Sequence, residues 1–161
     1  MRAIAKRIVS ALVVVLGLVA WGTRTDRDVV VAQATPKPII VYRAFTGADG
    51  KTHVEQKEYK MTLGADGSEH SERINVTGFS FLRRPPTHNM DFHPAPQRQF
   101  VITLAGKGEV ELEDGTKMPV DSDHILLAED LTGKGHVMRG SGTEPRLSLI
   151  LPLAPEAPAG K

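Results

Sequence analysis

Cysteine is absent from this chain of 161 residues. Without a thiol, the protein has neither a cysteine nucleophile nor a thiolate ligand for a metal. Aromatic residues make up only 5% of the chain, and the formal net charge is +1, so the basic excess typical of nucleic-acid-binding proteins is missing. A convincing helical period is also missing after the first residues. The sequence therefore argues against thiol chemistry and against a nucleic-acid partner.

The first 34 residues have the composition of an export signal. Basic residues precede an uncharged run, rich in Val, Leu and Ala, over residues 8–22, as in secretory signal peptides. The sequence Ala32-Gln33-Ala34 offers a cleavage site that would leave a mature chain from Thr35. The apolar run is shorter than the roughly 20 residues that span a bilayer. The alternative is an uncleaved N-terminal anchor, the protein's one contact with a membrane. Both interpretations place the domain outside the cytoplasm, in the periplasm or outside the cell.

The remaining sequence predicts one β-rich domain over residues 35–155, followed by a flexible tail over residues 156–161. Apolar residues recur with a period of two in short segments bounded by turn residues. We expect strands at residues 39–45, 53–63, 74–82, 98–104, 117–120, 124–128, 136–139 and 146–153, and a half-exposed strand around Val110. Asp114-Gly115 predicts a hairpin turn, and Gly78 predicts a bulge. Such a series of short strands predicts an all-β sandwich or barrel.

Two motifs in residues 79–153 resemble those of the cupin superfamily. The first cupin motif normally reads His-x-His, three or four residues, Glu, six residues, Gly. Here His93 and Gly106 match its two ends, whereas Ala95 replaces the second His and Gln99 replaces the Glu. The second motif normally ends Pro-x-Gly-x-x-His, and here a Gly-Lys-Gly run leads to His136 without the Pro. The chain is most similar to small single-domain cupins, which implies a cupin-type β-barrel, or jelly roll, and a homodimer.

The resemblance also implies a divalent metal, because cupins normally hold one metal ion with three His and one Glu. His93 and His136 carry over, and Gln99 offers a neutral carbonyl oxygen as a third ligand. A site of this composition suits Fe, Mn, Ni or Zn weakly. The alternative is a metal-free cavity in which such side chains hydrogen-bond a small-molecule ligand. Neither hypothesis decides whether the protein is an enzyme.

Several charged residues near these motifs have open roles. Arg98 either recognises a ligand carboxylate with its guanidinium or makes a surface salt bridge, which we favour. Glu129 either contributes a carboxylate to the metal or ligand site, where it could act as a general base, or lies in a solvated loop. For Asp130 we favour a solvated loop in which its side chain caps a turn. Arg83-Arg84 is expected to be a solvated strand end.

Period-two alternation predicts how the residues beside Gln99 are arranged. If Gln99 faces the barrel interior, so do Val101 and Thr103, and the residues between them face the opposite side. By the same rule, His136 shares a face with Met138. The predicted interior is small and partly apolar.

Overall fold

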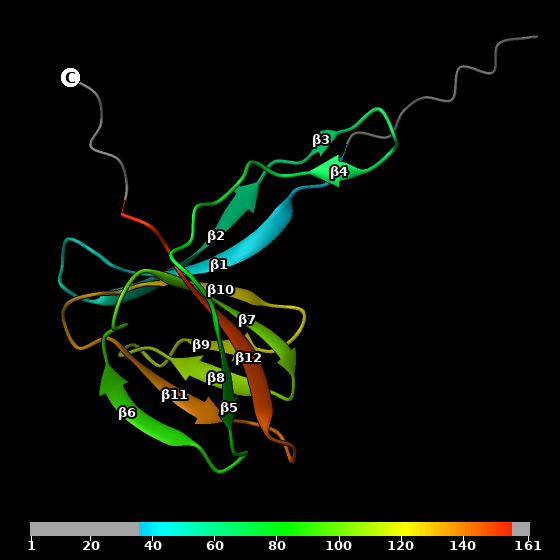
Figure 1. The fold of residues 1–161 in the computed structure, drawn as a ribbon. Coiled ribbons are helices and arrows are strands. Elements are labelled where there is room, and N and C mark those ends of the chain that lie inside the picture. The colour runs from blue at the N-terminus through cyan, green and yellow to red at the C-terminus, as the bar shows by residue number, and fades with distance from the viewer. Residues whose placement is uncertain (1–35, 156–161) are drawn as a thin grey trace, which may run out of the picture. The chain divides into compact units, whose positions relative to one another are not determined.

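The computed structural model describes residues 36–155, which form two facing β-sheets and a small separate hairpin (Figure 1). In these residues no helix is long and apolar enough to cross a membrane. The predicted export segment at residues 1–34 and the tail at residues 156–161 lie outside the described residues. Export and homodimer formation therefore stay predictions.

The described chain contains twelve strands in sequence order. They are β1 (Ile39–Thr46), β2 (Thr52–Tyr59), β3 (Thr62–Leu63), β4 (Glu69–His70), β5 (Ser80–Arg84), β6 (Asn89–His93), β7 (Gln99–Ala105), β8 (Gly108–Glu111), β9 (Lys117–Val120), β10 (Ile125–Glu129), β11 (His136–Gly140) and β12 (Arg146–Pro152).

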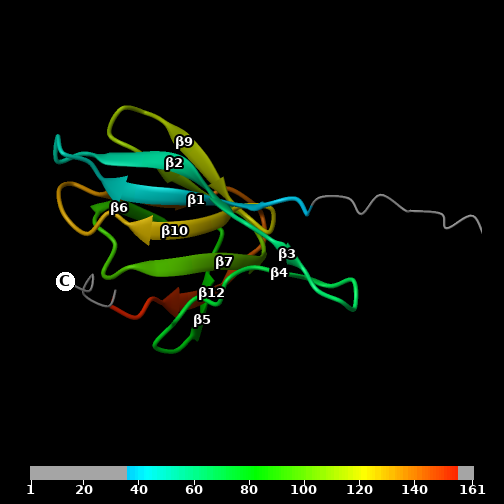
Figure 2. The same ribbon diagram turned by 90° about the horizontal axis from the view of Figure 1, so that it is seen from above.

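The strand order is that of a jelly roll with two added strands. The larger sheet has the order β2-β1-β10-β7-β12-β5, and the smaller has the order β6-β11-β8-β9. From β5 onward, successive strands alternate between the two sheets, except that β8 and β9 form a hairpin within the smaller sheet. This alternation gives the two Greek keys of a jelly roll. Strand β1 pairs in parallel with β10 and, with β2, extends the larger sheet (Figure 2). The predicted all-β fold is confirmed for the described residues.

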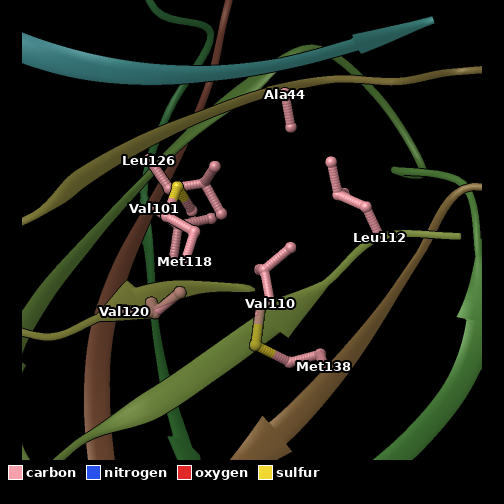
Figure 3. Close-up of a cluster of buried hydrophobic side chains, with 8 residues drawn as sticks. All are labelled: Ala44, Val101, Val110, Leu112, Met118, Val120, Leu126 and Met138. Atoms are coloured by element: carbon pink, nitrogen blue, oxygen red, sulfur yellow. The ribbon is translucent and has the colours of Figure 1, made fainter. Parts of the chain in front are cut away.

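A hydrophobic core fills one side of the space between the sheets. Its buried members come from both layers (Figure 3). They are Ala44, Val101, Val110, Leu112, Met118, Val120, Leu126 and Met138. Burying each such Val or Leu side chain stabilises the fold by about 1.5–3 kcal/mol before entropy is counted. Because Val101, Leu126 and Met138 also line the cavity described below, this core fixes the position of the cavity wall.

The outer face of the larger sheet carries a second apolar group. Phe100 packs there with Val41 and Leu127, and Ile102 joins them. This is the opposite side from Val101, as alternation along β7 predicted. Part of the loop before β5 lies over this face, where Val76 forms an isolated bridge with Leu153.

Local predictions succeeded where the turn chemistry was strong and failed where it was weak. The hairpin at Asp114-Gly115 is confirmed, with Gly115 at φ +82° between β8 and β9. The strand expected over residues 53–63 is split, because Thr62–Leu63 pairs with Glu69–His70 instead. The strand expected over residues 74–82 was wrong in its first half: regular pairing starts only at Ser80, and Gly78 follows a bend at Thr77 and lies outside any strand rather than in a bulge.

Strand β6 was not predicted at all. Three of its five residues are exposed and the other two are half-buried, so burial does not alternate along it. It is defined by pairing with β11, where His93 stands opposite His136. This pairing brings the two motif histidines side by side, at the candidate functional site.

Candidate functional site

A cavity of about 440 Å³ lies between the sheets. Its volume falls within the range of roughly 300–1,000 Å³ that is typical of small-molecule sites. Most of its wall is apolar, and its polar side chains are Ser80, Arg84, His93, Gln99, His136, Arg146 and Ser148. The described residues that line it include no Asp or Glu. The cavity is therefore an apolar chamber with a few polar groups, two of them guanidiniums that are cationic at neutral pH.

Asp130 holds the ring of His136 in place. The Nδ1–H of His136 donates to Asp130 Oδ2 at 2.6 Å, and the hydroxyl of Thr52 donates to the same oxygen at 3.3 Å. Asp130 is completely buried and His136 is 4% exposed. The prediction of a solvated, turn-capping Asp130 was therefore wrong. With Nδ1 carrying the proton, Nε2 of the neutral ring keeps its lone pair for a group in the cavity.

The backbone engages Nδ1 of His93, as Asp130 engages Nδ1 of His136. The Nδ1–H of His93 donates to the carbonyl oxygen of Asp91 at 2.7 Å, so Nε2 is again left with a lone pair. The His93 and His136 rings lie side by side, with 4.7 Å between their centroids and an interplanar angle of 52°. The two histidines predicted from the motifs are thus brought together at one wall of the cavity.

Gly135 makes this close approach sterically feasible. Its φ is +75°, in the region that other residues seldom occupy. A Cβ atom at this position would lie 2.0 Å from the carbonyl oxygen of His93 and 2.4 Å from the nitrogen of Pro94. The glycine directly before His136 is therefore required by both conformation and space.

Gln99 lies on the cavity wall with Val101, as alternation predicted. Thr103, the next residue on that face, is buried, and its hydroxyl is 3.3 Å from that of Ser148. His136 and Met138 also share the cavity face, as predicted. The alternation rule therefore placed the interior side chains of both β7 and β11 correctly.

Arg98 and Glu129 meet each other rather than the cavity. Nε and Nη2 of Arg98 donate to Glu129 Oε1 at 2.9 and 2.5 Å, and Arg43 Nε donates to Oε2 at 2.5 Å. Burial alone raises the pKa of Glu129, but the hydrogen bonds and charges of Arg43 and Arg98 outweigh it and hold that pKa below its usual range. Neither Arg98 nor Glu129 is among the residues that line the cavity.

Two cavity arginines were missed by the sequence reasoning. Arg84, expected at a solvated strand end, lines the cavity, and so does Arg146. Arg146 is 4% exposed. Burial, followed by the charge of Arg84, lowers the pKa of Arg146 to about 10. The one signal in the sequence was period two along β12, since Arg146 shares a face with Ser148 and Ile150.

The donor set fits a metal only in part. His93, Gln99 and His136 all line one cavity, and both imidazoles present a free Nε2. However, residues 36–155 contain no group of three or more His, Cys, Asp or Glu placed to hold an ion. The nearby carboxylate of Asp130 is engaged by the Nδ1–H of His136. The metal-ligand roles of His93, Gln99 and His136 stay a prediction.

Comparison with known proteins adds a distant structural similarity. No protein family model matches the sequence, and no curated protein matches it. Among solved structures, the chain is similar to the crystal structure of dTDP-6-deoxy-D-glucose-3,5-epimerase RmlC from Legionella pneumophila Philadelphia 1 in complex with dTDP-4-keto-L-rhamnose. This match has a TM-score of 0.37 at 12% identity and covers 73% of this chain and 72% of that chain. A similarity at this level assigns neither a ligand nor an activity to the present chain.

Proposed function

We propose that this protein is a cupin-like jelly roll that binds a small organic molecule in the cavity between its sheets. One observation carries the proposal: an apolar chamber of about 440 Å³ in which two imidazoles, an amide and two guanidiniums converge. Small-molecule sites are typically lined by apolar side chains, with a few polar groups that set orientation and specificity. The apolar wall would bind the body of the ligand and the polar groups would fix its direction.

His136 is the residue best prepared to act on such a ligand. Asp130 keeps the proton on Nδ1, so Nε2 can accept a hydrogen bond or a proton from a bound molecule. If the ring takes up a proton, the adjacent carboxylate stabilises the resulting imidazolium. The arrangement therefore supports binding of a hydroxyl or acidic C–H group near His136, with Gln99 as a neutral hydrogen-bonding partner.

Methionine methyl groups give a direct test of binding. Met90 and Met138 line the cavity, whereas Met118 is buried in the core without lining it. We expect members of a panel of small hydroxylated, amide and acidic compounds to shift the ¹³C-methyl resonances of Met90 and Met138, but not that of Met118, in the purified full-length protein. If no compound in the panel shifts Met90 or Met138, the proposal is wrong.

A metal site is the second candidate, and the hydrogen bonds of the two histidines favour it. Metal-ligating histidines usually donate their other ring N–H to a carboxylate or a backbone carbonyl. His136 donates to Asp130 and His93 donates to the carbonyl of Asp91. His93, His136 and Gln99 would hold the ion, which would act as a Lewis acid on an oxygen of the ligand.

Metal content separates the two candidates. The untagged protein, and its His93→Ala and His136→Ala variants, would be analysed by plasma mass spectrometry after incubation with Fe, Mn, Ni or Zn and removal of excess ion. The metal candidate predicts near-stoichiometric retention by the wild type and loss in both variants. Equal, low metal content in all three proteins would leave organic-ligand binding as the function.

A further inference from the structure

Arg84 and Arg146 are held directly opposite each other. Arg84 ends β5 and Arg146 begins β12, and the register of this antiparallel pair sets them side by side. Directly opposite residues project on the same face of a sheet. Both side chains line the cavity, so two guanidinium groups are presented to one space.

No carboxylate of the described residues neutralises either guanidinium. Among residues 36–155, no ion pair joins Arg84 or Arg146 to an Asp or Glu. Arg146 Nη1 donates one long hydrogen bond, at 3.4 Å, to the hydroxyl of Ser148. Arg84 Nη1 donates to His88 Nε2, and its buried Nε has no hydrogen-bond partner.

This arrangement is costly without a partner of opposite charge. A buried charge needs both a counter-charge and hydrogen bonds to offset the loss of water. Like charges directly opposite on paired strands also repel each other. Both pKa values reflect this cost to the charged forms. Burial lowers the pKa of Arg84, and burial together with the charge of Arg84 lowers the pKa of Arg146. An oxyanion that accepts several N–H groups removes these penalties at once.

We propose that Arg84 and Arg146 form an oxyanion site at one end of the cavity, and that the bound molecule carries a carboxylate or a phosphate group there. This inference rests on the proposed function, because it assumes that the cavity holds an organic ligand. The cavity face of β12 continues from Arg146 through Ser148 and Ile150. The anionic end of the ligand therefore lies at the arginines, and its uncharged remainder runs along this wall toward the imidazoles and Gln99.

The test compares matched probes that differ in charge. Butanoate, butanamide and propyl phosphate would be titrated at constant ionic strength into the full-length protein, with the Met90 and Met138 methyl resonances as the readout. Constant ionic strength is needed because salt screens charge–charge attraction. We expect at least one of the two anions to bind about 10- to 100-fold more tightly than butanamide, as charged hydrogen bonds predict. The tighter of the two anions identifies whether the site prefers a carboxylate or a phosphate.

Arginine variants assign the effect to the site. Arg146→Met and Arg84→Met are expected to weaken binding of the preferred anion by about 10- to 100-fold. Arg83→Met is the matched control, because Arg83 is exposed on the same strand and does not line the cavity. It should bind the anion as the wild type does. A thermal melt of each variant shows that any loss of binding occurs in folded protein.

Three results would overturn the inference. Equal binding of butanoate, propyl phosphate and butanamide, or undiminished anion binding by a folded Arg146→Met variant, would do so and leave the proposed function intact. The third is the absence of a shift with any of the three probes. In that case the oxyanion site is wrong, and the broader compound panel decides separately whether the cavity binds organic molecules.

Discussion

Two pairs of arginines in this protein differ in what surrounds their charges. Arg43 and Arg98 both donate to the carboxylate of Glu129, which is held between them. Arg84 and Arg146 also lie together, yet no carboxylate of the described chain joins them. The first pair keeps about 30% of each side chain exposed, whereas Arg146 is almost fully buried. The two more exposed arginines are thus neutralised, whereas the most buried arginine is not.

The contrast separates a structural role from a binding role. A carboxylate shared by two guanidiniums satisfies all three groups and ties β1 and β10 to the segment that leads into β7. A buried guanidinium without an anion destabilises the fold, because no interaction within the described residues offsets its loss of hydration. Such a group weakens the empty fold and is useful only when an anion arrives. The two pairs should therefore respond in opposite ways to mutation.

The largest loss of stability is expected for Glu129→Gln. The substitution leaves Arg43 and Arg98 without their shared carboxylate and should lower the free energy of unfolding by about 2 kcal/mol at pH 7. Because the pKa of Glu129 is held below its ordinary value of 4.5, the contribution of its carboxylate is complete above that value and is lost as pH falls through the depressed folded-state pKa. Urea denaturation of both proteins at several pH values measures this difference.

Two results would count against this account of Glu129. One is a variant that is as stable as the wild type at pH 7. The other is a gap between the two proteins that stays constant below pH 4.5, since protonation of Glu129 should remove it. Either would mean that the carboxylate does not hold the arginines together energetically.

A smaller loss, with a distinct signature, is expected for Asp130→Asn. The amide can donate to His136 Nδ1, which reverses the ring's preferred tautomer and places the proton on Nε2. Stability should fall by about 1 kcal/mol, because a charged hydrogen bond becomes a neutral one. The imidazole ¹⁵N shifts of His136 report the tautomer directly. An unchanged tautomer would show that Asp130 does not set the proton position, and His93→Gln serves as a control that leaves the Asp130–His136 pair intact.

The positions of the motif residues on the cavity wall followed from local sequence rules, whereas the positions of Asp130 and Arg84 did not. His93, Gln99 and His136 were placed at the cavity because strand alternation and the motif glycine act locally. Asp130 was misjudged because it is buried and bonded to Thr52 and His136, partners that only the folding of the chain brings to it. No local pattern distinguishes such a carboxylate from one in a solvated loop.

The cavity arginines illustrate the same limit in a different way. Arg83 and Arg84 are adjacent and chemically identical, and only the register of β5 against β12 decides which of them enters the cavity. A shift of one residue would exchange their faces. Register between strands so far apart is set by the packing of the whole sheet, so the sequence predicted the strand but not which charge it buries.

The smallest effect, and the one with the most informative sign, is expected for Arg146→Met in the ligand-free protein. The pKa of Arg146 is depressed to about 10 in the fold, so the penalty of burying its charge is fully present below that pH and is relieved only as pH rises above it. At pH 7 the apolar replacement should therefore leave stability unchanged or raise it by about 1 kcal/mol. Thermal and urea unfolding, with Arg83→Met as the matched control, measure the change. A loss as large as that of Glu129→Gln would show that Arg146 stabilises the empty fold, and the contrast between the two arginine pairs would then disappear.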